Sequence, residues 1–245
     1  QAFSFQDILD AMVASAKSTV SVAIACACVG IIVGSCSITG FALNMANTII
    51  SIGGKSLMFT LVFTMITCMI LGMGLPSIPS YIITSTIAAP ALVQLGIPAL
   101  VAHMFCFYFA MFANLTPPVA LAAYAGSAIA KSNPMKTALN ASRLAIAAFI
   151  VPYIFAFNPA MLFIDTGVLG VVTIIITSLI GLFGVAAGLE GYMFANLNVI
   201  ERLLSIVGGL CLIIPGTVTD LVGIVLVGVS AALQMMQKKK AAAAG

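Results

Sequence analysis

The groups best able to do chemistry in this sequence lie in two short clusters of helix-breaking residues, at 72–77 and at 114–118. Glycine permits tight turns and close backbone approach, and proline removes a backbone donor and so leaves carbonyl oxygens unpaired. Such carbonyls, with nearby hydroxyl and amide oxygens, are hard ligands that would suit a sodium ion. The candidate site residues are Gly72, Gly74, Pro76, Ser77, Asn114, Thr116 and Pro117.

The spacing of the two clusters supports a shared site. Gly96, within a Gly-Ile-Pro turn, lies about 22 residues after Gly74 and about 20 residues before Thr116. Helical arms of similar length rise equally, at about 1.5 Å per residue, so both clusters reach similar depth. An unpaired backbone group in hydrocarbon costs several kcal/mol, so broken backbone there must be buried in protein or line a wet cavity. The matched breaks therefore predict an ion or substrate site near the membrane midplane.

Helical arms must position these clusters. We expect residues 57–95 to form a re-entrant hairpin with its tip at 72–77, and residues 98–130 to form a discontinuous helix. Pro117 and Pro118 would free the carbonyls one turn back, at Ala113 and Asn114. Alternatively, the first cluster is a lipid-side turn between two full spans, and the second is a packing kink satisfied by neighbouring groups.

Composition defines the class of protein. The chain is 62% hydrophobic and 6% charged, with a mean hydropathy of +1.25, whereas a soluble domain has about 25% charged residues. Several apolar stretches of about 18 or more residues carry no charge, which is typical of membrane-spanning helices. We predict an all-α, polytopic helical membrane protein. The net charge of +3 indicates no nucleic-acid partner, and Lys238–Lys240 read as a cytoplasmic anchor.

The sequence does not favour an enzyme. A membrane-embedded enzyme would need an acid–base pair or metal ligands facing a cavity, but the apolar spans hold only Asp220 and the single histidine, His103. A lone histidine on an apolar helix is usually structural. The six cysteines lie in apolar runs without metal-ligand spacing or a disulfide framework. We expect no cofactor and no metal other than sodium as the coupling ion.

The region around the two clusters also resembles a known family. Gly-Met-Gly-Leu-Pro at 72–76, Ile-Ala-Ala-Pro-Ala-Leu at 87–92 and Leu-Thr-Pro-Pro-Val-Ala-Leu-Ala-Ala-Tyr at 115–124 resemble the large membrane (permease) subunit of TRAP transporters. The resemblance covers residues 5–162. The Gly-Leu-Pro form and the Ala-Ala-Tyr ending are most similar to the TAXI-type branch, in which the two membrane subunits are often fused.

This resemblance implies a sodium-coupled secondary transporter for organic (carboxylic) acids. It implies a periplasmic or extracellular substrate-binding protein and a small membrane subunit or fused N-terminal half as partners. The cell location would be the bacterial or archaeal cytoplasmic (inner) membrane. In the family such breaks line the ion and substrate cavity, but many relatives have Asp where this chain has Pro76. Backbone carbonyls would then contribute more to a sodium site here.

The predicted organisation has three segments. Residues 1–17 form an interfacial arm helix or a linker. Residues 18–162 form half of an inverted-repeat, elevator-type transporter, with spans at 18–38 and 138–157. Residues 163–245 are C-terminal membrane helices of unassigned role, with a span at 166–188 and a block at 203–236 that is either a tight hairpin or two short spans. This unassigned tail favours the alternative of a non-catalytic scaffold subunit.

The distribution of basic residues predicts the orientation. Lys17, Lys131, Lys136 and Arg143 fall on one side in this topology and Lys55 on the other, so the first side is cytoplasmic and the hairpin opens from outside. Arg143 could pair with a substrate carboxylate, or its side chain could extend to the cytoplasmic interface. The chain would be the C-terminal half of the transporter.

Overall fold

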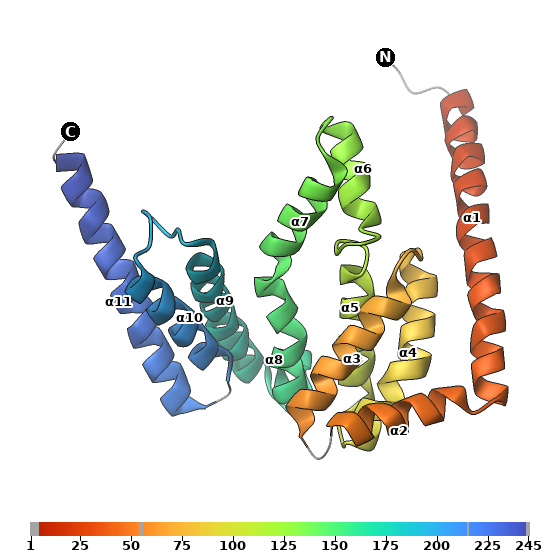
Figure 1. Ribbon diagram of the computed structural model, residues 1–245, viewed down its shortest axis with the longest axis horizontal. Helices are drawn as coiled ribbons and strands as arrows, with labels where there is room; N and C mark the ends of the chain where they lie inside the picture. Colours follow the sequence, from red (N-terminus) through yellow and green to blue (C-terminus); the bar gives the residue numbers. More distant parts are fainter. Residues whose placement is uncertain (1–4, 54–55, 215, 244–245) are drawn as a thin grey trace. The chain divides into compact units, whose positions relative to one another are not determined.

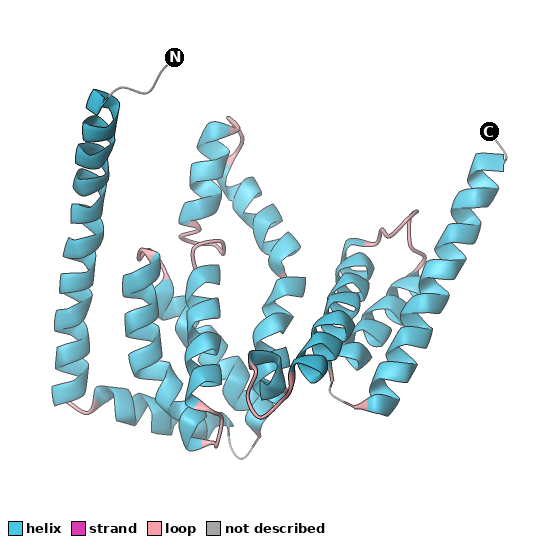
Figure 2. Ribbon diagram, turned by 180° about the vertical axis from the view of Figure 1, so that it is seen from behind, coloured by secondary structure: helices cyan, strands magenta, loops and turns pink. Residues whose placement is uncertain are grey.

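The computed structural model describes residues 5–53, 56–214 and 216–243, and these residues form helices joined by short loops (Figure 2). Within these residues, β-structure is limited to an isolated antiparallel bridge between Tyr192 and Asn196. The prediction of an all-α membrane protein is confirmed. Three described helices are long and apolar enough to cross a membrane, or four if a pair bent by 46° counts as one span.

Eleven α-helices and two short 3-10 helices follow one another in the described residues (Figure 1). They are α1 (Phe5–Ile38), α2 (Phe41–Gly53), α3 (Leu57–Gly72), α4 (Ser77–Gln94), α5 (Ala99–Phe112), α6 (Leu121–Ile129), α7 (Pro134–Ala145), η1 (Ala147–Ile150), α8 (Val151–Phe157), η2 (Pro159–Leu162), α9 (Val168–Glu190), α10 (Val199–Ile213) and α11 (Thr217–Ala243). The chain divides into two compact units, residues 1–138 and 139–245, which we describe separately.

The first helix of unit 1 is longer than predicted. The sequence predicted an arm helix up to residue 17 and a separate span over 18–38, but Phe5–Ile38 is one continuous helix. The boundary region contains no glycine or proline, and the Thr19 hydroxyl there donates to the carbonyl of Ser15 within the helix (2.9 Å). An interfacial position for residues 1–17 stays a prediction.

Helices α4 and α5 form the centre of unit 1. Helix α4 packs against α1, α2, α3 and α5. Its Ile83 and Ile87 form a buried cluster with Val29 of α1, and its Ala91 forms another with Ile49 of α2. Small buried alanines and hydroxyl residues let the neighbouring helices approach closely, as is common between membrane helices. The arms of the expected hairpin, α3 and α4, pack against each other and against α5.

Helices α9, α10 and α11 form the centre of unit 2, and glycines allow their close approach. A Cβ added to Gly181 of α9 would lie 2.8 Å from the carbonyl oxygen of Gly209 in α10, and one added to Gly223 of α11 would lie 2.7 Å from that of Gly208. Helices α10 and α11 pack directly against each other. Both interpretations of 203–236, a tight hairpin and two short spans, stay open, and within this block Val218–Met236 is long and apolar enough to cross a membrane. Lys55 and the side chains of Lys238–Lys240 lie outside the described residues.

Candidate functional site

The first predicted cluster is a tight turn between α3 and α4. Helix α3 ends at Gly72 and α4 begins at Ser77. Gly74 has a φ of +76°, a conformation that glycine adopts without the steric cost that other residues incur. The backbone N–H of Leu75 donates to the carbonyl of Gly72 (3.5 Å). The glycines and the proline thus reverse the chain where the sequence predicted.

The base of this turn is packed against α5. Gly72 is buried, and a Cβ added to it would lie 3.2 Å from the Cα of Ala110 and 2.7 Å from the Ser80 hydroxyl oxygen. That hydroxyl lies 3.4 Å from the carbonyl oxygens of both Gly72 and Ala110, so its single hydrogen is donated to one of them or shared between the two. Glycine at position 72 is therefore required by the close approach of α3 to α5.

The second predicted cluster is an irregular segment between α5 and α6. Helix α5 ends at Phe112 and α6 begins at Leu121, and the peptide bond between Pro117 and Pro118 is cis. The prediction that the carbonyls of Ala113 and Asn114 are both free is wrong for Asn114. Its carbonyl accepts a hydrogen bond from the backbone N–H of Ala122 (3.0 Å), because the chain folds back on itself.

Three oxygen-bearing groups of this segment keep the capacity to bind a cation. The carbonyl of Ala113 accepts no hydrogen bond from the described residues. The half-buried side-chain amide of Asn114 has no hydrogen-bond partner among them either. The Thr116 hydroxyl donates to the carbonyl of Phe112 (3.0 Å), which leaves its oxygen lone pairs available.

The turn and the break lie against each other. A Cβ added to Gly74 would lie 3.6 Å from Cγ1 of Val119, three positions beyond Thr116. Figure 1 shows the α3–α4 turn and the α5–α6 break at the same level of unit 1. Gly74, Pro76 and Ser77 are exposed. The predicted site residues therefore occupy neighbouring segments, with Gly72 buried beneath them.

Two further residues of the break were missed by sequence reasoning. Ala120 is fully buried at the start of α6 in the left-handed conformation (φ 37°, ψ 46°), and no glycine signals this in the sequence. The Tyr124 hydroxyl donates to the carbonyl of Pro118 (2.8 Å) and closes the loop. Tyr124 is the last residue of the third motif noted above, and this bond gives the motif a structural reason.

His103 and Arg143 both have partners within the chain. The Tyr81 hydroxyl of α4 lies 3.1 Å from Nδ1 of His103 in α5, which supports a structural role for the histidine. Nε of Arg143 lies 3.4 Å from Oε2 of Glu190, with both side chains at least half exposed, so this ion pair contributes little to stability. The arginine thus pairs with a carboxylate of its own chain.

The described residues contain no group of three or more histidine, cysteine or acidic side chains that could hold a metal ion. The six cysteines are free thiols, and Cys68 and Cys106 are fully buried in α3 and α5. Buried cysteines of this kind pack as small apolar residues.

Comparison with protein families gives a match over most of the chain. Residues 1–169 match the family described as the tripartite ATP-independent periplasmic transporter, DctM component. The matched part contains both the α3–α4 turn and the α5–α6 break. Comparisons with curated proteins and with solved structures gave no match. The chain therefore belongs to the DctM family, the large membrane component of TRAP secondary transporters.

Proposed function

We propose that this chain forms part of a secondary transporter that couples uptake of an organic (carboxylic) acid to sodium, with the α3–α4 turn and the α5–α6 break lining the cavity. The observation that carries the proposal is the proximity of the two breaks, since a Cβ added to Gly74 would lie 3.6 Å from Cγ1 of Val119. Secondary transporters hold ions and substrates where two interrupted helical elements meet at the same depth in the membrane.

The chemistry of the available groups supports a monovalent cation. The carbonyl of Ala113, the amide oxygen of Asn114 and the hydroxyl oxygen of Thr116 are neutral oxygen ligands on one short segment. A calcium site usually includes several carboxylates, and none occurs in the turn or the break. A site of neutral oxygens would hold sodium weakly enough for exchange during transport.

The N-terminus of helix α4 supports the proposal that the substrate is an anion. Helix α4 begins at Ser77, directly after the turn, and its first backbone N–H groups point out of the helix with a partial positive charge. Pro76 precedes them and Ser77 is exposed. A carboxylate held at this helix end, beside a sodium ion at the break, would have its charge balanced from two sides.

The finer assignment follows the sequence motifs. We propose a TAXI-type transporter of a bacterial or archaeal cytoplasmic membrane, in which the chain is the C-terminal half and α3–α4 is a re-entrant hairpin opening from outside. Its partners would be a substrate-binding protein and either a small membrane subunit or a fused N-terminal half.

The test is uptake by the full-length protein in liposomes with its cognate substrate-binding protein. Uptake of a radiolabelled organic acid should require the binding protein and an inward sodium gradient, and should stop when choline replaces sodium. Equal uptake with choline would contradict sodium coupling. Intact assembly with no uptake of any organic acid tested would favour the scaffold alternative.

A further inference from the structure

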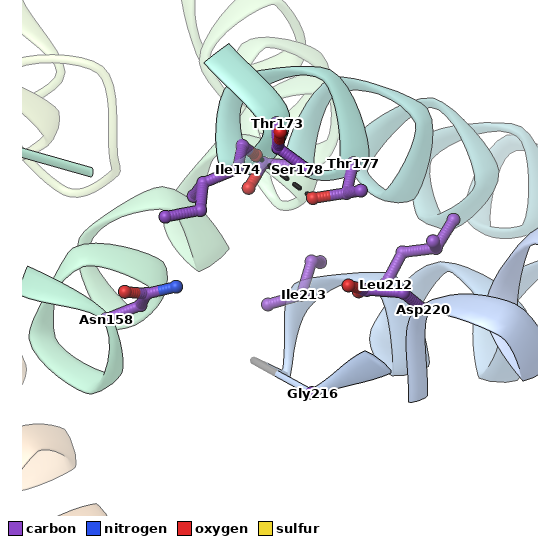
Figure 3. Close-up of a pocket in the computed structure, with 9 residues that line it drawn as sticks. All are labelled: Asn158, Thr173, Ile174, Thr177, Ser178, Leu212, Ile213, Gly216 and Asp220. Atoms are coloured by element: carbon purple, nitrogen blue, oxygen red, sulfur yellow. Dashed lines mark hydrogen bonds between the residues drawn. The ribbon is translucent and has the colours of Figure 1, made fainter. Parts of the chain in front are cut away.

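A cavity with a partly polar lining lies within unit 2. Its volume is about 240 Å³, and Figure 3 shows residues of α9 on one side of it and residues of α10 and α11 on the other. The residues that line it are Asn158, Thr173, Ile174, Thr177, Ser178, Leu212, Ile213, Gly216 and Asp220. All but Asn158 lie beyond the residues that match the DctM family.

Asp220 is the charged residue of this lining. Its side chain is half-buried, and its carboxylate makes no ion pair or hydrogen bond with any described residue. No lysine, arginine or histidine lines the cavity. Asp220 lies in the first turn of α11, near the start of the apolar stretch Val218–Met236. A carboxylate in such surroundings favours a cation.

Ser178 offers an unpaired hydroxyl to the cavity. Its side chain is 2% exposed and makes no hydrogen bond to the described residues, although it lines the cavity. Among the described residues only Thr64 has a fully buried side-chain oxygen without a partner, so the unpaired Ser178 oxygen is reached from the cavity, where a ligand or water can bond to it. The side-chain amide of Asn158 likewise has no partner among the described residues. A ligand in the cavity would satisfy both groups.

The neighbouring threonines add oxygen atoms. The Thr177 hydroxyl donates to the carbonyl of Ile174 (3.1 Å) and that of Thr173 donates to the carbonyl of Leu169 (3.0 Å). Their hydrogens are used within α9, so these oxygens meet a ligand as acceptors. The polar lining thus offers one carboxylate and several neutral oxygens.

We propose that this cavity binds a hydrated alkali-metal cation, Na⁺ or K⁺, with Asp220 as the charged ligand and Ser178 as a neutral one. A single carboxylate matches a single positive charge, whereas calcium sites usually have more acidic ligands. The volume exceeds that of a bare ion, and since a water molecule occupies about 30 Å³, the ion would keep several of its waters.

The test uses the full-length chain in lipid nanodiscs and follows amide hydrogen exchange. NaCl, KCl and choline chloride are compared at equal ionic strength. NaCl or KCl should slow exchange in peptides covering 173–178 and 218–222 relative to choline chloride. Asp220→Asn should raise the half-maximal cation concentration roughly 10- to 150-fold, the effect of losing a charged partner. Ser178→Ala should raise it about 2- to 10-fold.

Asp165→Asn is the matched control, because Asp165 is exposed in unit 2 and does not line the cavity. It should respond as the unsubstituted protein does. Identical exchange in alkali chlorides and choline chloride, or an unchanged cation response in both Asp220→Asn and Ser178→Ala, would overturn the proposal. If Asp220→Asn does not fold, Ser178→Ala decides. Peptides covering 72–77 and 113–120 report on the turn and the break separately, and a response confined to them would also overturn it.

Discussion

Gly74, at the turn between α3 and α4, lies against Val119, in the break between α5 and α6, with 3.6 Å between the Cβ position of the glycine and Cγ1 of the valine. These residues are 45 positions apart in sequence (119 − 74), and each belongs to an interrupted helical element. Movement of the turn away from the break would separate these two residues. We therefore expect binding of the proposed cation at the break and the position of the turn to influence each other.

Substitution of Gly72 tests the packing beneath this contact. Gly72→Ala would place a Cβ 2.7 Å from the Ser80 hydroxyl and 3.2 Å from the Ala110 backbone, so we expect a loss of about 1–3 kcal/mol in unfolding free energy. Gly126→Ala in α6 is the control, since nothing lies within 4 Å of its Cβ position, and it should stabilise by about 0.5–1 kcal/mol. Denaturation in detergent measures both. Equal stability of the two variants would show that α3 and α5 are farther apart.

Thr64 offers a prediction of opposite sign. Its hydroxyl oxygen is buried in α3 without a hydrogen bond to the described residues, so Thr64→Val should leave the unfolding free energy unchanged or raise it by about 1–3 kcal/mol. Thr60→Val is the matched control. The Thr60 hydroxyl donates to the carbonyl of Ser56 (3.3 Å), so its loss should lower the unfolding free energy. A clear loss of stability for Thr64→Val would mean that the hydroxyl has a partner, such as a bound water.

A polar network joins α10 to α11 in unit 2. Glu201, which is 6% exposed, accepts hydrogen bonds at Oε2 from Nε2 of Gln234 (2.7 Å) and from the backbone N–H of Asn198 (2.9 Å). Gln234→Ala should lower the unfolding free energy by about 1–3 kcal/mol, because a hydrogen bond to a buried carboxylate is lost. Gln94→Ala, at an exposed position, should change it by less than about 0.5 kcal/mol. Similar effects of the two substitutions would contradict the network.

The membrane orientation is tested by labelling. In a cysteine-light variant, single cysteines at Lys131 and Asp165 should react with an impermeant maleimide from opposite sides of the membrane. Both positions are exposed, so access of the reagent is not limited by packing. Lys131 should label from the cytoplasmic side. Labelling of both from one side would contradict the predicted order of spans.

The positions of the helix breaks could be predicted from sequence because glycine and proline act locally. The ends of α3, α4 and α5 fall at the Gly72–Ser77, Gly96 and Asn114–Pro118 signals. Which partners the backbone groups at these breaks find for their hydrogen bonds could not be predicted. The bond from Ala122 to the Asn114 carbonyl depends on how the chain folds back.

Contacts within unit 2 could not be predicted from the sequence either, because they join residues that are far apart along the chain. The pairing of Glu201 with Gln234 joins residues 33 positions apart, and no local pattern indicates it. Asp220 was recognised as an isolated acid, but its neighbours across the cavity belong to α9 and to the end of α8. The continuous helix α1 was missed because a change from polar to apolar sequence does not require a break in the helix.

The sodium dependence of uptake in Thr116→Val tests the central claim most directly. The substitution keeps the shape of the side chain and removes a hydroxyl oxygen from the segment that also holds the Ala113 carbonyl, which accepts no hydrogen bond from the described residues. Loss of one ligand should raise the sodium concentration for half-maximal uptake about 5- to 150-fold. Thr67→Val in α3 is the control, because its hydroxyl makes the same kind of bond, to the carbonyl of Phe63 (2.8 Å), away from the break. An unchanged sodium dependence in Thr116→Val, at normal abundance, would contradict a sodium site at this break.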